Sequence, residues 1–223
     1  MERRTVDAAL LEMAKMPFQL SDEEGKFLIH LARNTVQTYL ETGKTLKTPA
    51  DTPKKLFEKC GVFVTINTVK HGEYELRGCI GYPYPTNPLV EATIDAAVSS
   101  ATSDPRFYPL QVEELERVVF EVSVLTPPEP VQVANPKEYV KSIKVGEHGL
   151  IVEKGPYKGL LLPQVPVEWG WREEEFLCQC CVKAGLAPDS WLTKGAKIYR
   201  FSAIVFEEEA PKGEVKRKSL TPA

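Results

Sequence analysis

Apolar residues recur at helical spacing in the first part of the chain. Residues 21–24 read Ser-Asp-Glu-Glu, which is a capping box with additional acids for the first helical turn. Apolar and aromatic side chains follow at intervals of three and four residues, and Gly43 supplies a helix stop. This pattern predicts a long amphipathic helix that ends near Gly43. Shorter helical patterns cover residues 6–16 and residues 54–59.

The next segment has the composition of a β-hairpin followed by a helix. Residues 62–66 are rich in β-branched and aromatic side chains, which favours a strand. His71 and Gly72 have turn character, so residues 74–81 are expected to form the return strand. Asn87 and Pro88 then begin a helix that ends before Pro105, and residues 118–125 form a further strand.

The second half of the chain repeats this order of elements. Residues 127–130 read Pro-Pro-Glu-Pro, a stiff linker that predicts a boundary near residues 127–135. Beyond it the pattern predicts a hairpin over residues 150–162, a helix over 173–184 and a strand over 198–206. Helices mixed with hairpins favour antiparallel over parallel sheets. We therefore expect an α+β fold, with antiparallel sheets packed with helices in two lobes and residues 76–81 at the cleft between them.

Composition and charge narrow the class of protein. The chain has 223 residues, 43% of them hydrophobic, and a formal net charge of -3, as in an ordinary globular protein. This charge argues against non-specific binding to duplex nucleic acid, but it leaves room for a local basic groove. No apolar run is long enough to span a bilayer, and the charged start lacks an apolar signal region, so we expect a cytoplasmic protein. Residues 207–223 are charged and poor in apolar side chains, which predicts a mobile tail.

The five cysteines form an odd count, unlike a secreted disulfide framework, so reduced thiols are expected. Abundant Lys and Glu with few Asn and Gln are typical of thermophilic proteins, in which cytosolic disulfides do occur. A disulfide among Cys178, Cys180 and Cys181 therefore stays an open alternative. A structural zinc site needs four ligands, and no second Cys or His pair has matching spacing. We expect these thiols to pack in the core, and we expect no metal and no other cofactor.

The hexapeptide Leu-Arg-Gly-Cys-Ile-Gly at residues 76–81 is the most informative stretch. Strand alternation places Leu76 and Ile80 on one face and Arg77 and Cys79 on the other. A neighbouring cation lowers the pKa of a thiol, so Cys79 is a candidate for covalent or ligand-contacting chemistry. The alternative is a small cysteine packed in the core. The glycines that flank the cysteine allow a ligand or another backbone to approach closely.

Two further blocks carry candidate residues. A nucleophilic cysteine needs a base, and His148 is a weak candidate for that role; the alternative is a histidine that caps a strand. Arg106 offers a planar fork of donors suited to a carboxylate or phosphate, and Asp104 can pair with Arg106 or with Arg77. The alternative is a helix-terminating turn held by an ion pair.

The hexapeptide also resembles the hallmark of the AMMECR (AMME chromosomal region) domain family. The similarity continues in later blocks, so it extends from about residue 18 to residue 206; these blocks are residues 103–107, 147–150, 159–165 and 183–186. The resemblance implies a single AMMECR-type domain over residues 1–223, of the archaeal or prokaryotic type. It implies no settled biochemical activity, although relatives have been suggested to act in nucleic-acid modification.

Two hypotheses of function follow. In the first, a cleft around the hexapeptide binds an anionic small molecule, a nucleotide or RNA, with or without catalysis. Cys79 would then be the reactive or contact residue, and the substrate-binding residues would be Arg77, Gly78, Gly81, Asp104 and Arg106. In the second, the resemblance implies a non-catalytic partner, because genes of this family often neighbour those of Memo-type and radical S-adenosylmethionine proteins. The lack of a cofactor motif favours the second hypothesis slightly.

Overall fold

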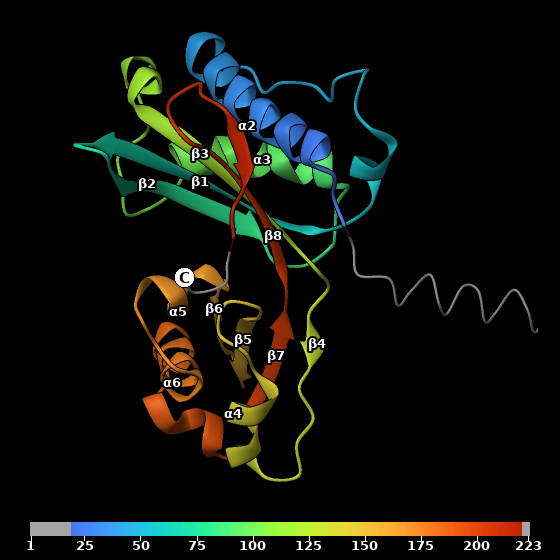
Figure 1. The fold of residues 1–223 in the computed structure, drawn as a ribbon, viewed down its shortest axis with the longest axis vertical. Coiled ribbons are helices and arrows are strands. Elements are labelled where there is room, and N and C mark those ends of the chain that lie inside the picture. Colours follow the sequence, from blue (N-terminus) through green and yellow to red (C-terminus); the bar gives the residue numbers. More distant parts are fainter. Residues whose placement is uncertain (1–18, 220–223) are drawn as a thin grey trace, which may run out of the picture.

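A computed structural model describes residues 19–219, which fold into two lobes (Figure 1). The helix predicted over residues 6–16 lies outside the described residues. The α+β class is confirmed, since helices pack on two sheets in which every pair of neighbouring strands is antiparallel. Within residues 19–219, no helix is long and apolar enough to cross a membrane.

The larger lobe is a five-stranded sheet with helices on one face. Its strand order is β2-β1-β3-β8-β9. The strands are β1 (Gly61–Lys70), β2 (Glu73–Tyr82), β3 (Val118–Leu125), β8 (Ala203–Glu208) and β9 (Val215–Arg217). Helices α2 (Asp22–Thr42) and α3 (Leu89–Thr102) lie against this sheet, and the short 3-10 helices η1 (Lys54–Phe57) and η2 (Val112–Arg117) complete the lobe. Ser21 caps α2 in the predicted capping box, and Gly43 ends it in the left-handed region.

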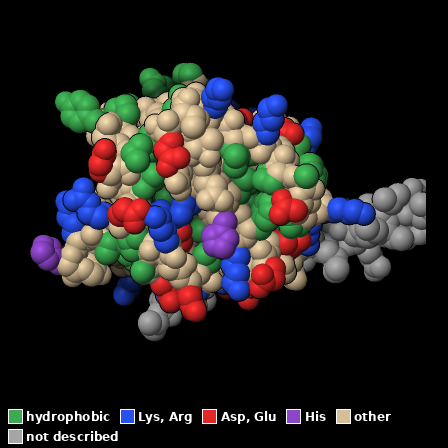
Figure 2. Space-filling model, turned by 90° about the horizontal axis from the view of Figure 1, so that it is seen from above, with side chains coloured by type: hydrophobic (Ala, Val, Ile, Leu, Met, Phe, Trp, Pro, Cys, Tyr) green, Lys and Arg blue, Asp and Glu red, His purple; other side chains and the backbone are tan. Residues whose placement is uncertain are grey.

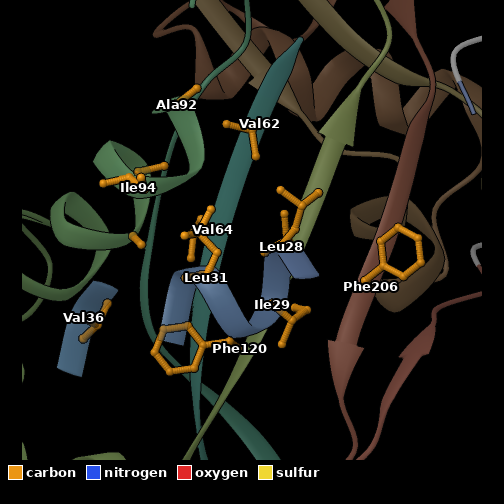
Figure 3. Close-up of a cluster of buried hydrophobic side chains, with 14 of the residues drawn as sticks. Leu28, Ile29, Leu31, Val36, Val62, Val64, Ala92, Ile94, Phe120 and Phe206 are labelled. Atoms are coloured by element: carbon orange, nitrogen blue, oxygen red, sulfur yellow. The ribbon is translucent and has the colours of Figure 1, made fainter. Parts of the chain in front are cut away.

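The core of this lobe lies between the sheet and the two helices. Alternate residues of β1 and β3 point toward the helices and are buried, among them Val62, Val64 and Phe120. Figure 3 shows them facing Leu28 and Leu31 of α2. The two helices cover this face of the sheet, and the opposite face is turned toward the smaller lobe.

The smaller lobe is a four-stranded sheet with its own helices. Its strand order is β4-β7-β5-β6. The strands are β4 (Glu129–Pro130), β5 (Gly149–Lys154), β6 (Tyr157–Leu161) and β7 (Lys197–Phe201). The helices are α4 (Tyr139–Ser142), α5 (Gln164–Glu168) and α6 (Glu173–Lys183), with 3-10 helices η3 (Pro136–Glu138) and η4 (Pro188–Leu192). Phe176 and Leu177 of α6 are fully buried against this sheet.

Between residues 19 and 219 the chain crosses from one lobe to the other twice. It leaves β3 for β4 at residues 126–128, just ahead of the boundary that the proline-rich linker predicts. It returns at Ser202, between β7 and β8 (Figure 1), so the single strand predicted over residues 198–206 is two strands in two sheets. The crossings lie side by side, because Thr126 N–H donates to Ser202 O and Ser202 N–H donates to Thr126 Oγ1, each at 2.9 Å. Apolar side chains of both lobes meet beside them, including Phe63, Leu125 and Leu162.

The expectation of a mobile tail from Glu207 onward is wrong for residues 207–219. Glu208 is only 1% exposed, and its carboxylate accepts from Arg33 Nε at 2.6 Å and from the Phe120 N–H at 2.9 Å. The chain then turns and adds β9 to the sheet, where Arg217 pairs with Asp22. Charged composition misleads here because the charges are paired with partners remote in the sequence.

Candidate functional site

A β-bulge at Arg77 reverses the predicted arrangement of the hexapeptide. In the pairing of β1 with β2, Ile66 lies opposite Gly78 but Asn67 lies opposite Leu76, so Arg77 is the extra residue. A bulge of this kind shifts the alternation of faces by one residue. The prediction that Arg77 and Cys79 share a face is therefore wrong. Cys79 lies on the face of Thr65, while Arg77 reaches toward the segment that follows α3.

Arg77 is held by a carboxylate. Its Nε and Nη2 donate to the two oxygens of Glu114 at 2.8 and 3.0 Å, and its Nη1 donates to the carbonyl of Tyr108 at 2.8 Å. The pairing lowers the pKa of Glu114 below its usual value, chiefly through the hydrogen bond from Arg77. The Phe107 ring lies 6.0 Å from the Arg77 guanidinium and 5.4 Å from that of Arg106. The two predicted arginines thus approach one aromatic ring, each with a carboxylate partner.

Asp104 and Arg106 clamp the backbone of Cys79. Strand β2 is at the edge of the sheet, so its outward N–H and C=O groups need partners from elsewhere. The Cys79 N–H donates to Asp104 Oδ2 at 2.8 Å, and Arg106 Nη2 donates to the Cys79 carbonyl at 3.4 Å. Asp104 is buried, and Arg106 lowers its pKa to about 2 through a bidentate hydrogen bond. This is the ion-paired turn of the structural alternative, and it also fixes the position of the cysteine.

The two glycines of the hexapeptide allow close packing of protein on protein. A Cβ at Gly78 would lie 2.1 Å from the carbonyl oxygen of Ser100 in α3. A Cβ at Gly81 would lie 2.2 Å from the carbonyl oxygen of Val62. The hydroxyl of Ser100 in turn accepts from the Ile80 N–H at 2.8 Å. Gly78 therefore seats α3 against β2, and Gly81 allows the close approach of β1.

The Cys79 thiol is partly buried and accepts a hydrogen bond from Thr65 Oγ1 at 3.3 Å. Burial raises its pKa above the ordinary value, and the charge of Glu121 adds to that effect. The Thr65 hydrogen bond and the charge of Arg106 act in the opposite direction without reversing it. Arg77, the arginine expected to activate the thiol, is not among the groups that shift this pKa, and the net shift is upward.

His148 lies in the smaller lobe at the start of β5. Its Nδ1 accepts the Lys144 N–H at 3.1 Å, and burial lowers its pKa. This hydrogen bond closes the turn over residues 144–148. The charged residues that affect the pKa of His148 are Arg200, Glu147, Lys144 and Glu129. None of these residues contacts Cys79, so the structure does not bring the predicted base and nucleophile together.

A polar row across the lower face of the larger sheet was missed from the sequence. The register places Cys79 opposite Thr65, Thr65 opposite Glu121, and Glu121 opposite Glu207. Glu121 is only 5% exposed and accepts from Gln164 Nε2 at 3.1 Å and Lys218 Nζ at 2.9 Å. Burial alone would lower the pKa of Lys218, but Glu121 and Glu207 outweigh it and raise that pKa. The signal in the sequence is a lone acid, Glu121, inside an otherwise almost wholly apolar strand.

The cysteines of α6 are free thiols that pack in the smaller lobe. Cys180 and Cys181 are buried, and the Cys180 thiol lies 3.6 Å from the Leu150 carbonyl oxygen. Burial raises the pKa of Cys180 to about 12. Among residues 19–219, no group of three or more His, Cys, Asp or Glu side chains could hold a metal ion.

The segment of the hexapeptide around the bulge borders a cavity. A cavity of about 360 Å³ lies beside Arg77. Three basic, two acidic and four uncharged side chains line it: Lys70, Arg77, Arg117, Glu75, Glu114, Thr68, Leu76, Phe107 and Val118.

Comparison with known proteins places the chain in a family. The sequence profile of the AMMECR1 family matches residues 29–206. A protein from Pyrococcus abyssi is 58% identical over 205 residues, which cover 91% of this chain and 98% of the relative. One from Methanopyrus kandleri is 54% identical over 203 residues, with 91% and 97% covered. The crystal structure of the uncharacterized protein PH0010 from Pyrococcus horikoshii is similar with a TM-score of 0.88 and 57% identity, covering 91% of this chain and 100% of that one. The chain belongs to the AMMECR1 family.

The names of these AMMECR1 relatives state no activity, so function has to be argued from the site. In this member of the AMMECR1 family, two blocks that carry the resemblance converge on the polar row. The hexapeptide contributes Cys79, and residues 159–165 contribute Gln164. The block at residues 103–107 contributes the clamp on Cys79, whereas the block at residues 147–150 lies apart from it.

Proposed function

We propose that this chain binds an anionic small molecule in the cavity beside Arg77. A volume of about 360 Å³ falls within the range of small-ligand pockets, which begins at roughly 300 Å³. Phe107 offers an aromatic face on which a nucleobase or similar ring can stack. The proposal keeps the predicted anionic ligand and the predicted role of this segment, and it moves the direct contact from Arg106 to residues that line the cavity.

The charge balance of the cavity carries the proposal. Lys70 is paired with Glu75, and Arg77 is paired with Glu114, so these four charges cancel. Arg117 is exposed, and no carboxylate within residues 19–219 lies at ion-pair distance from it. It leaves one excess positive charge in the lining. A guanidinium binds a carboxylate or phosphate with two parallel hydrogen bonds, so Arg117 could bind one such group of a ligand.

Arg77 has a different role in this proposal from the one expected for it. Its donors are already directed at Glu114 and at the Tyr108 carbonyl. It therefore positions Glu114, the acidic wall of the cavity, while Arg117 faces the ligand. Removal of Arg77 would leave Glu114 unpaired next to the anion and would repel it.

A binding role without thiol chemistry is the form of function that the site supports best. The pKa of Cys79 is raised by burial, and the thiol lies on the other face of the sheet from the cavity. This observation favours the second hypothesis, a subunit that binds or presents a small molecule to partner enzymes. Figure 2 shows acidic and basic side chains interspersed over the outer face of the larger lobe, without the basic stripe that binding to a nucleic-acid backbone requires.

Calorimetric titration tests the proposal. Wild type is titrated with inorganic phosphate and with nucleoside monophosphates, together with Arg117→Ala and a matched control, Arg172→Ala. Arg172 is an exposed arginine of the smaller lobe, so the control loses the same charge far from the cavity. Charged hydrogen bonds contribute roughly 1.5–3 kcal/mol, so Arg117→Ala is expected to weaken binding by about tenfold or more and Arg172→Ala to leave it unchanged. Equal affinity of wild type and Arg117→Ala would exclude the site.

A further inference from the structure

We infer that the lower face of the larger sheet carries a second site, which accepts a primary ammonium group and which Lys218 occupies in this structure. The site consists of Glu121, Glu207 and Gln164, with Glu168 at its rim. It is separate from the cavity beside Arg77 and does not rest on the function proposed above.

The first observation is the coordination of the Lys218 ammonium. Its Nζ lies 2.9 Å from Glu121 Oε2, 3.3 Å from Glu207 Oε2 and 3.9 Å from Glu168 Oε1. An ammonium has three N–H donors and no acceptor, so it can face several carboxylates at once; here Glu121 accepts a hydrogen bond, and Glu207 and Glu168 lie at ion-pair distance. Lys216 Nζ also lies 3.8 Å from Glu207 Oε1, so Glu207 is shared by two lysines, and the three acids still outnumber the ammonium groups around them.

The second observation is an unpartnered acceptor in the same place. Gln164 is only 6% exposed, and its Nε2 donates to Glu121 at 3.1 Å and to Ser123 Oγ at 3.3 Å. These two bonds fix which end of the amide faces Glu121, because a carboxylate accepts only from the NH₂ end. The other end, Oε1, is buried and has no hydrogen-bond partner within residues 19–219. A buried amide oxygen without a donor leaves room for one further N–H beside the ammonium group that Lys218 supplies.

The third observation concerns the position of Lys218 in the chain. It follows β9, which has only three residues, and its own N–H makes a single backbone bond to the Val205 carbonyl. Arg217, which precedes it, is anchored separately by Asp22 and by the Leu20 carbonyl. Lys218 can therefore leave the carboxylates without breaking the β9 pairing. An intramolecular ligand with this arrangement can be exchanged for an external one.

The direction of the polar row defines the shape of the external ligand. Cys79 lies two strands away from Glu121 in the same row, with Thr65 between them. Two inter-strand spacings amount to about 10 Å. A short, extended amine whose ammonium group is bound at Glu121 would therefore lie along Thr65 and approach the thiol. The same ammonium group occurs in small amines and in the lysine side chain of a polypeptide.

Chemical rescue tests this inference. Lys218→Ala empties the site, and n-butylammonium, which reproduces the lysine side chain, is added during thermal unfolding. We expect the melting temperature of Lys218→Ala to rise by at least about 2 °C at saturation, because a ligand that binds only the folded state stabilises it. Tetramethylammonium, which has no N–H donor, should give no such rise. Wild type should not respond, and neither should the control Lys26→Ala, which removes a lysine of α2 paired with the exposed Glu23.

A double variant and a second pair of amines complete the test. Adding Glu121→Gln to Lys218→Ala should abolish the response to n-butylammonium. Saturable binding of spermidine above that of Nα-acetyl-lysine amide would indicate a small-molecule amine, and the reverse order a lysine of another chain; either order supports the site. Lack of saturable binding of all these amines to Lys218→Ala, or an equal effect of tetramethylammonium, would overturn the inference.

Discussion

Asp104 Oδ2 accepts the backbone N–H of Cys79 at 2.8 Å across a separation of 25 residues. The sequence places both residues among the candidates for chemistry, and the structure joins them through the main chain instead of through the thiol. Arg106 completes the contact on the carbonyl side of the same residue. The pair therefore closes the open edge of β2 at the point where a strand without partners would be accessible to other chains.

The charge of Asp104 is expected to contribute to stability in a pH-dependent way. Its pKa falls from 3.8 to about 2 on folding, which corresponds to about 2 kcal/mol of stabilisation. Because the folded-state pKa is depressed, this contribution is fully present above pH 3.8 and is lost as the pH falls through 2. Asp104→Asn should therefore lower the free energy of unfolding by about 2 kcal/mol at pH 7, with the difference from wild type shrinking between pH 4 and pH 2. Urea unfolding at several pH values measures it, and a difference that is independent of pH would contradict the assignment.

The buried pair of Arg33 and Glu208 is expected to be among the most sensitive points of the fold. Both are almost fully buried, and Arg33 also donates to the carbonyls of Leu115 and Val118. Glu208→Ala would leave a buried guanidinium without its counter-charge, which costs roughly 3–5 kcal/mol. The neighbouring exposed acid offers the control, since Glu209→Ala should change stability by less than about 0.5 kcal/mol. Equal midpoints of denaturant unfolding for the two variants would disprove the prediction.

Gly78→Ala should destabilise the protein although alanine is the smallest available side chain. Its Cβ would meet the backbone of Ser100, which cannot move away as a flexible side chain could. We expect a loss of about 1–3 kcal/mol, typical of overpacking, and a displaced α3. The neighbouring variant Cys79→Ala removes a partly buried thiol without creating a clash and should cost less. If thermal unfolding ranks the two variants in the opposite order, the close packing of α3 on β2 is not what requires glycine here.

Cys79 should react slowly with thiol reagents in the folded protein. Burial raises its pKa, so little thiolate is present at pH 7.5. Alkylation by iodoacetamide, followed by mass spectrometry of the Cys79 peptide, should be at least about tenfold slower in native protein than in urea. Glu121→Gln removes a negative charge that raises the pKa and should increase the native rate. A native rate equal to that in urea would show that the thiol is open and unperturbed.

Local patterns predict the elements of this fold well, whereas contacts between distant residues are what they miss. Alternating side chains and turn residues locate β1, β2 and β3, and the capping box locates α2, because each signal is complete within a few residues. The bulge at Arg77 has no such local signal, since it depends on the register of β2 against β1. This bulge alone places the Cys79 side chain on the opposite face of the sheet from Arg77.

The same limit explains the site and the C-terminal segment. Glu208 looks like part of a solvated charged end until Arg33 is placed beside it, 175 residues away in the sequence. Glu121 and Gln164 meet only because the lobes face each other. The candidate residues of the hexapeptide are close in space to one another. The partners that determine their chemistry come from distant parts of the sequence and are brought to them by the fold.

The paired crossings at Thr126 and Ser202 form a short two-stranded connection that could serve as a hinge between the lobes. Two hydrogen-bonded segments side by side bend across their width more easily than they shear along their length. A rotation of the smaller lobe about this ribbon would draw Gln164 away from Glu121 while both sheets keep their ladders intact. Its cost would be confined to the apolar contact of Phe63 and Leu125 with Leu162 and to a few polar contacts between the lobes. Such a rotation would open the polar row without disturbing the strand pairing of either lobe.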